Sequence, residues 1–393
     1  MASRHKTGED TTGADTAGAG DIGIGLIGSG FMGRSHALAL ATAPRLFDLP
    51  RKPRLELMGD IDQATADDAA RRFGFARATG DWQALIADPA VELVDITAPN
   101  VWHKPMALAA IAAGKPVWCE KPLAPDAAQA KEMADAAEAA GIPTAVGFNY
   151  LKNPILALAR EIIESGEIGE IVGFNGIHAE DYMTDPSAPW TWRLDPAGGA
   201  GVVADLGSHI ISIARFLLGD IEEVSGQLHT VVAERPVAPG ARETRKVEAD
   251  DQARALVRFA GGATGTIQAS WVATGRKMQL AAEITGTRGT LAFNQERLNE
   301  LELYTTGQPN GREGFKTILA GPEHDPYGAF CPAPGHQLGF NDLKTIEARD
   351  VLLGLAGPKA AWPDFREGWA VQRVVDAILR SHADRAWVRV ADI

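Results

Sequence analysis

Three separated segments carry side chains whose chemistry belongs together. They are the glycine-rich turn Gly28-Ser29-Gly30-Phe31-Met32-Gly33, the tripeptide Glu120-Lys121-Pro122, and the run Asp205-Leu206-Gly207-Ser208-His209. A glycine turn can hold a phosphate group. A lysine, an aspartate and a histidine can together take the proton of an alcohol while its hydride leaves. In this order along one chain, the three segments predict a nicotinamide-dependent dehydrogenase.

The glycine turn stands in the context that a dinucleotide site requires. It follows an apolar run, Ile22–Gly28, which predicts a buried strand, and it precedes a predicted helix over Gly33–Ala41. Glycines in such a turn let backbone N–H groups approach a pyrophosphate at the positive end of the helix. We therefore expect Gly28, Gly30, Phe31, Met32 and Gly33 to bind the cofactor; a glycine-rich turn without a ligand is the alternative.

Asp60 ends the second predicted strand, Leu55–Gly59. An acidic side chain at this position can accept hydrogen bonds from the adenosine ribose and repels a 2′-phosphate. The sequence therefore favours NAD over NADP. In the alternative, Asp60 caps the next helix and Asp62 takes the ribose role.

The proposed catalytic residues come from two of these segments. Asp205 and His209 are four residues apart, so a helix would place them on one face. A neutral histidine can accept a hydroxyl proton near neutral pH, and Asp205 could orient the imidazole or bind the substrate. Lys121 follows a strand that should end at the carboxyl edge of the sheet, where it could stabilise negative charge on the reacting oxygen. A helix cap, a core histidine and a solvated lysine are the alternatives.

The elements that must position these residues predict two domains after a disordered tail at 1–20. Between 21 and 149, strand-like and helix-like segments alternate, which predicts an α/β Rossmann domain with a parallel sheet. Residues 150–393 predict an α+β substrate-binding domain with a large, mainly antiparallel open sheet, and residues 306–340, rich in Gly and Pro, predict a long loop. The strands expected in this second domain are Ile171–Ile177, Glu223–Val232, Asp251–Phe259, Ala263–Trp271, Glu283–Thr285 and Thr290–Phe293.

The composition argues against several other classes of protein. The chain has 393 residues and a net charge of −13, which disfavours nucleic acid or an anionic membrane as a partner. Cys119 and Cys331 are its only cysteines, so we expect a reducing, cytoplasmic setting without disulfides. No apolar run is long enough for a membrane span, and the first 20 residues lack the apolar region of a secretory signal. No spacing resembles a zinc site, so no metal is expected.

The combination of motifs resembles the Gfo/Idh/MocA family, named for glucose–fructose oxidoreductase and inositol dehydrogenase, over about residues 21–385. The resemblance implies a Rossmann domain followed by a domain with a large open sheet, whose outer face commonly forms dimers or tetramers. We therefore expect a homo-oligomer. The supporting segments are Gly28–Gly33, Thr97–His103, Ala113–Pro122, Gly147–Tyr150, Ser165–Gly169 and Gly198–Gly219.

The same resemblance implies roles for single residues. It makes Lys121, Asp205 and His209 the catalytic set, with His209 as the general base. It also implies that Glu120 contacts the nicotinamide ribose and that Asn149 lies near the nicotinamide. Others would line the cofactor pocket: Thr97, Pro99, Asn100 and His103. The chain departs from the family in having Leu151 where an arginine is frequent and Ser212 where many relatives have an aspartate.

Among the branches of this family, inositol and pyranose-sugar dehydrogenases fit best. Trp192 and Arg193 precede the glycine run and would cover the substrate, because aromatic faces suit a sugar ring and arginine can bond two hydroxyls. His178 and His336 are further candidates for hydroxyl contacts; packing roles are the alternative for all four. The expected reaction is reversible oxidation of a secondary carbinol of a cyclic polyol or sugar to a ketone. The rivals are an NAD-dependent glycoside hydrolase and a non-catalytic sugar sensor, and the intact catalytic set argues against the sensor.

Overall fold

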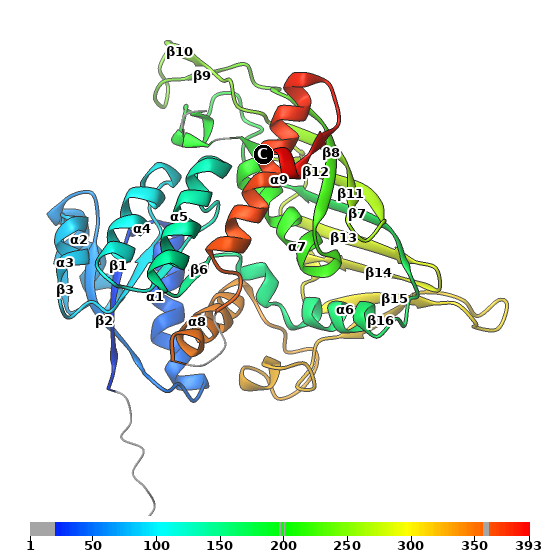
Figure 1. Cartoon of the computed structure of the whole chain (residues 1–393), viewed down its shortest axis with the longest axis horizontal. Coiled ribbons are helices and arrows are strands. Elements are labelled where there is room, and N and C mark those ends of the chain that lie inside the picture. Colours follow the sequence, from blue (N-terminus) through cyan, green and yellow to red (C-terminus); the bar gives the residue numbers. More distant parts are fainter. Residues whose placement is uncertain (1–19, 196–197, 200, 357–360) are drawn as a thin grey trace, which may run out of the picture.

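The computed structural model describes residues 20–195, 198–199, 201–356 and 361–393. Two sheets with their helices form the body of the molecule (Figure 1). The expected disordered tail lies outside the described residues, apart from Gly20. Within the described ranges, no helix is both long and apolar enough to cross a membrane.

The N-terminal layer is a six-stranded parallel sheet with strand order β3-β2-β1-β4-β5-β6. Its central strand β1 is buried along its whole length, as expected of a parallel sheet with helices on its faces. The Rossmann prediction is therefore confirmed. The elements are β1 Ile22–Ile27, α1 Phe31–Leu46, β2 Pro53–Gly59, α2 Gln63–Phe73, β3 Arg77–Thr79, α3 Trp82–Ala87, β4 Leu93–Ile96, η1 Asn100–Trp102, α4 His103–Ala112, β5 Val117–Cys119, α5 Ala127–Ala140 and β6 Thr144–Val146.

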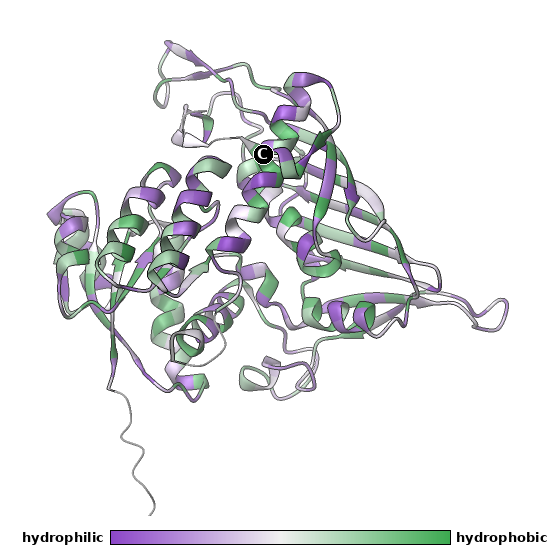
Figure 2. Cartoon of the chain, in the orientation of Figure 1, coloured by the Kyte–Doolittle hydropathy of each residue, from purple (hydrophilic) through white to green (hydrophobic). Residues whose placement is uncertain are grey.

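The second sheet has nine strands in the order β16-β15-β14-β13-β7-β12-β11-β8-β17. Only the β7–β12 pair in it is parallel, so the prediction of a mainly antiparallel sheet is confirmed. Alternate residues of β11 are buried and exposed. Figure 2 shows hydrophobic and hydrophilic residues interspersed along the strands of this sheet. The strands are β7 Ile171–Ala179, β8 Ile221–His229, β11 Gln252–Phe259, β12 Thr264–Ser270, β13 Gln279–Gly286, β14 Gly289–Asn294, β15 Glu300–Thr305, β16 Lys316–Leu319 and β17 Val388–Arg389.

The expectation of a continuous loop at 306–340 is wrong in two places, since β16 and the short 3-10 helix η7 Tyr327–Ala329 interrupt it. Residues Lys316–Leu319 form β16, which pairs with β15 at the edge of the sheet. This strand has four residues, none of them buried, so its sequence lacks the alternation that marks a half-buried strand. A small two-stranded sheet, β9 Glu234–Pro236 with β10 Thr244–Lys246, was not predicted either, because strands of three residues are too short to show an alternating pattern.

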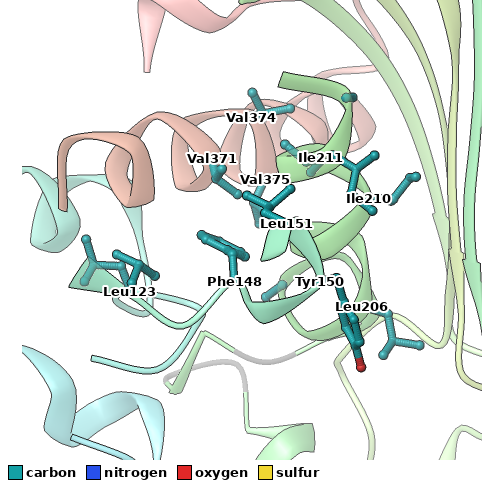
Figure 3. Packing of buried hydrophobic residues seen from close by; sticks show 14 of the residues in the cluster. Leu123, Phe148, Tyr150, Leu151, Leu206, Ile210, Ile211, Val371, Val374 and Val375 are labelled. Atoms are coloured by element: carbon teal, nitrogen blue, oxygen red, sulfur yellow. The ribbon is translucent and has the colours of Figure 1, made fainter. Parts of the chain in front are cut away.

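A shared core holds the two layers together. The other helices in the described residues are η2 Asn149–Lys152, α6 Pro154–Glu164, η3 Trp192–Leu194, η5 Val203–Gly207, α7 Ser208–Leu218, η6 Gln295–Arg297, η7 Tyr327–Ala329, α8 Phe340–Ala356, α9 Phe365–Asp384 and η8 Val390–Asp392. Figure 3 shows Phe148 and Leu151, which follow the N-terminal sheet, beside Ile211 of α7 and Val371 and Val375 of α9. The last two long helices return to the N-terminal layer, since α8 packs on α1 and α9 packs on α5.

This core predicts that two substitutions to alanine have different effects on stability. Ile211 is 0% exposed, so Ile211→Ala should lower the free energy of unfolding by about 2–5 kcal/mol. Leu379 on α9 is 36% exposed, so Leu379→Ala should cost about 1 kcal/mol or less. Urea unfolding followed by fluorescence measures both. Equal losses would contradict the placement of Ile211 at the junction of the layers.

Candidate active site

The glycine turn between β1 and α1 is built for close backbone approach. Gly28 has φ +101°, a left-handed conformation that favours glycine. A Cβ on Gly33 would lie 2.0 Å from the Gly28 carbonyl oxygen, whereas a Cβ on Gly30 would meet no protein atom within 4 Å. Gly33 therefore closes the turn, and Gly30 leaves its outer side open for a ligand at the start of α1.

A cavity of about 720 Å³ lies over this turn, at the carboxyl ends of the parallel strands. Both layers contribute to its wall, because Trp192, Arg193 and Asp205 come from the C-terminal part of the chain. The other predicted site residues in the wall are Gly28, Gly30, Phe31, Met32, Asp60, Thr97, Pro99, Asn100, Glu120 and Lys121.

Other predicted site residues are not among those that line this cavity: Gly33, His103, Asn149, His178, His209 and His336. The ring nitrogens of buried His103 face the carbonyl oxygens of Pro122 and Ala98, at 2.9 and 2.8 Å. This side chain therefore connects two loops of the pocket from behind instead of lining it. His336 is exposed on its loop, with Nδ1 3.2 Å from the Ala333 carbonyl oxygen. Asn149 is buried at the start of η2.

The two acidic residues after β2 have different surroundings. The Asp60 carboxylate accepts hydrogen bonds from the backbone N–H groups of Ser29, at 2.8 Å, and Ile61, at 2.7 Å, and it lines the cavity. The Asp62 carboxylate accepts from the Thr65 N–H and caps α2. The geometry therefore favours Asp60 over Asp62 for a ribose contact.

An ion pair across the two layers forms the centre of the site. Lys121 Nζ lies 3.0 Å from Asp205 Oδ1 and also donates to the Asp205 carbonyl oxygen at 2.9 Å. The second carboxylate oxygen of Asp205 accepts from the Tyr182 hydroxyl at 2.8 Å and lies 3.4 Å from Arg193 Nε. Burial opposes ionisation of Asp205, but the charges of Lys121 and Arg193 hold its pKa well below the ordinary value. Asp205 is therefore a fixed anion.

The expected contact between Asp205 and His209 is not formed. Asp205 belongs to a π-helical turn, Val203–Gly207, and His209 to the first turn of α7. The spacing of four residues aligns side chains in a regular α-helix, and the wider turn changes this relation. The side chain of Asp205 is occupied by Lys121 and Tyr182 instead.

His209 lies in an aromatic pocket beside the ion pair. Its ring centroid is 4.7 Å from that of Tyr150, 6.2 Å from that of Phe148 and 5.4 Å from that of His178. Burial, together with the positive charge of Lys121, lowers the pKa of His209 well below its usual value. The imidazole is therefore neutral and can accept a proton. Its Nδ1 is buried and has no hydrogen-bond partner in the part of the chain that the structure describes.

Two residues of the site were missed from the sequence. Tyr182 binds Asp205 from the loop after β7, and a single tyrosine in a loop has no distinctive spacing. Asp250 anchors the start of the turn that carries Asp205, because its carbonyl and carboxylate oxygens accept from the N–H groups of Val202 and Val203, both at 3.0 Å. Gly201 fits only as glycine here, since a Cβ would lie 2.1 Å from Asp250 Oδ1.

Sequence comparison agrees with this architecture in both layers. Residues 22–148 match the oxidoreductase family with an NAD-binding Rossmann fold, and residues 156–292 match the GFO/IDH/MocA C-terminal domain. The levoglucosan dehydrogenase of Pseudarthrobacter phenanthrenivorans is 38% identical over 92% of this chain and 96% of that protein. The chain belongs to the Gfo/Idh/MocA family. It is an NAD-binding oxidoreductase, and both the fold and the cofactor predictions are confirmed.

Other members of the Gfo/Idh/MocA family are similar in sequence or structure. A levoglucosan dehydrogenase solved with NADH and levoglucosan is 39% identical, with a TM-score of 0.91 over 95% of this chain and 100% of that one. An NAD-binding oxidoreductase from Klebsiella pneumoniae is 46% identical, with a TM-score of 0.90 over 94% of this chain and 99% of that chain. The scyllo-inositol 2-dehydrogenase (NAD(+)) of Bacillus subtilis is 29% identical over 61% of this chain and 65% of that protein.

The different surroundings of Asp60 and Asp62 predict different effects on cofactor binding. Asp60→Ala should weaken NAD binding about tenfold, because a charged hydrogen-bond acceptor is lost. The same change should reduce the preference for NAD over NADP, because the charge that repels a 2′-phosphate is gone. Asp62→Ala removes a helix cap and should cost about 1 kcal/mol of stability with little change in cofactor affinity. Titration of both variants with NADH and NADPH, followed by fluorescence, separates the two effects. Unchanged cofactor constants in Asp60→Ala would reject the ribose assignment.

Asp250 predicts a pH-dependent difference in stability. Burial raises the pKa of this carboxyl from 3.8 to about 6, so the folded protein holds the proton at a higher pH than the unfolded chain does. Between these values the folded state binds more protons, and its stability falls as the pH rises. An asparagine at this position has no proton to release, so the Asp250→Asn variant does not lose stability in this way. The difference in free energy of unfolding between Asp250→Asn and the original chain should therefore shift in favour of the variant, by up to roughly 3 kcal/mol, from pH 4 to pH 7. Urea unfolding at several pH values tests this; a difference that does not vary with pH would contradict it.

Proposed function

We propose that this oxidoreductase uses NAD to oxidise a secondary hydroxyl of a pyranose-type sugar reversibly to a ketone, with levoglucosan as the first candidate substrate. The observation that carries the proposal is the Lys121–Asp205 ion pair, which opens onto the NAD cavity. The near full-length similarity to levoglucosan dehydrogenase supports the sugar class. The scyllo-inositol 2-dehydrogenase of Bacillus subtilis has lower identity and shorter coverage.

The residues around the cavity suit an NAD molecule with its pyrophosphate at the start of α1. Gly28 and Gly30 would hold the pyrophosphate, Asp60 the adenosine ribose, and Glu120 the nicotinamide ribose. The space beside Gly30 supports this placement, because it contains no protein atom within 4 Å of a Cβ built there. When bound, the nicotinamide supplies the acceptor for the hydride of the carbinol carbon.

In this proposal Lys121 stabilises the reacting oxygen. An ammonium group has three N–H donors, and Lys121 uses two of them on the carbonyl and carboxylate oxygens of Asp205. The third can bond the substrate hydroxyl and favour the negative charge that develops on it. Because Asp205 is itself held by Tyr182, it fixes the direction of the lysine side chain.

His209 is proposed as the proton acceptor. Its lowered pKa keeps the ring neutral, which is the form that a general base requires. Trp192 and Arg193 are proposed to cover the sugar from the opposite layer. The Arg193 guanidinium carbon lies 4.6 Å from the Trp192 ring centroid, so the two side chains form one surface with an aromatic face and hydrogen-bond donors.

The proposed roles predict a separation of catalysis from cofactor binding. Lys121→Met and His209→Asn should each lower kcat for the sugar by about 100-fold or more, while NADH still binds. Lys131→Met is the matched control, since Lys131 pairs with Asp135 on the surface of α5, and it should keep kcat within about twofold.

Near-normal turnover in either site variant would reject the catalytic assignment. A protein that binds NADH and cleaves a glycoside without net NADH formation would favour the hydrolase of the same family. Binding of sugar without any conversion would favour a sensor.

A further inference from the structure

Five ionisable side chains are buried together behind the NAD cavity, and the proposed catalytic steps use none of them directly. We call them the Lys344 cluster: His36 on α1, Asp95 on β4, Glu120 at the end of β5, and Lys344 and Glu347 on α8. None is more than 4% exposed. Burial of so many charged groups is costly unless they are paired, so their arrangement needs a physical reason.

Lys344 makes the contacts that join the cluster. Its Nζ lies 2.8 Å from Glu120 Oε1, 2.5 Å from Glu347 Oε2 and 3.1 Å from His36 Nε2. His36 Nε2 is also 2.8 Å from Glu120 Oε1, while its Nδ1 faces Asp95 at 2.9 Å. Lys344 and His36 therefore converge on the same oxygen of Glu120 from two helices.

The charges support ionised Glu120. Burial alone would raise the pKa of Glu120, but the positive charge of Lys344 and the hydrogen bond from His36 lower it well below its ordinary value. Conversely, burial disfavours the charged form of Lys344, yet Glu120 and Glu347 raise its pKa. Each ion therefore depends on the other for its charge.

Glu120 is also fixed in position. Its second oxygen, Oε2, accepts from the backbone N–H of Lys121 at 3.1 Å. Gly147 packs so closely that a Cβ there would lie 2.5 Å from Oε1. Glu120 lines the NAD cavity next to Lys121. Contacts from α1, from α8 and from its own loop therefore fix one orientation of this carboxylate at the cavity.

We propose that Lys344 is a positioning residue for NAD: from helix α8, it holds the Glu120 carboxylate in the orientation that binds the cofactor. Removal of Lys344 then loosens a cofactor contact in the Rossmann domain, although Lys344 itself does not line the cavity. The inference rests on the cofactor-binding role proposed for Glu120. It makes full NAD affinity dependent on the packing of α8 against the Rossmann layer.

The test compares NADH affinity, measured by fluorescence titration of the full chain, among four variants. Lys344→Met should weaken NADH about tenfold, and Glu120→Gln should weaken it to a similar or greater extent. The double variant Glu120→Gln with Lys344→Met should bind NADH no more weakly than Glu120→Gln alone, because Lys344 acts only through that carboxylate. Lys152→Met is the matched control: it removes a 2.8 Å ion pair between Lys152 and Asp350 of the same helix, and its NADH affinity should stay within about twofold.

A fifth variant covers the case in which Lys344→Met does not fold. Exchange of both Lys344 and Glu347 for Met replaces this ion pair by apolar side chains of similar size, which proteins often tolerate, and Glu120 keeps its contact with His36. It should fold, by thermal melting, and still bind NADH about tenfold more weakly. Unchanged NADH affinity in this variant, additive effects in the double variant, or an equal loss in Lys152→Met would overturn the proposal. None of these readouts needs a sugar. Failure to oxidise any sugar would therefore reject the proposed function without deciding whether Lys344 positions Glu120 for NAD.

Discussion

The pairing of Lys121 with Asp205 is the interaction on which the site depends. It joins residues that are 84 positions apart and belong to different layers of the molecule. The neighbouring residue Glu120 is paired with Lys344 of α8. Two adjacent residues of the Rossmann sheet are thus held by opposite charges from the C-terminal part of the chain. Because an unpaired buried charge is costly, these pairs favour the observed placement of Asp205 and of α8 against the Rossmann sheet.

Much of the fold could be predicted from local patterns. The apolar strand Ile22–Ile27, the glycine turn after it and the long alternating strand Gln252–Phe259 each carry a strong periodic signal. The patterns failed where an element was short and exposed, as in Lys316–Leu319, or irregular, as in the π-helical turn that carries Asp205. In that turn Asp205 contacts Lys121 and Tyr182, not His209, which the sequence spacing had suggested as its partner.

The residues of the candidate site could be predicted only where they belong to a sequence motif. Glu120 and Lys121 belong to such a run, but Tyr182 and Lys344 reach the site through tertiary packing and carry no local signal. His103 lies in a run that was predicted to line the cofactor pocket, and the carbonyl oxygens that face its buried ring are contacts that the run itself does not indicate. Sequence motifs thus indicate the chemistry, whereas the contacts that hold it in place depend on the fold.

Formation of NADH by the purified protein, followed at 340 nm, tests the proposed sugar oxidation most directly. The assay offers NAD with levoglucosan, common pyranoses and the inositols in turn. We expect steady NADH formation with one stereochemical series of sugars, and much less reduction of NADP. No absorbance change with any of these compounds, from a protein that binds NADH, would contradict the assignment of a sugar dehydrogenase.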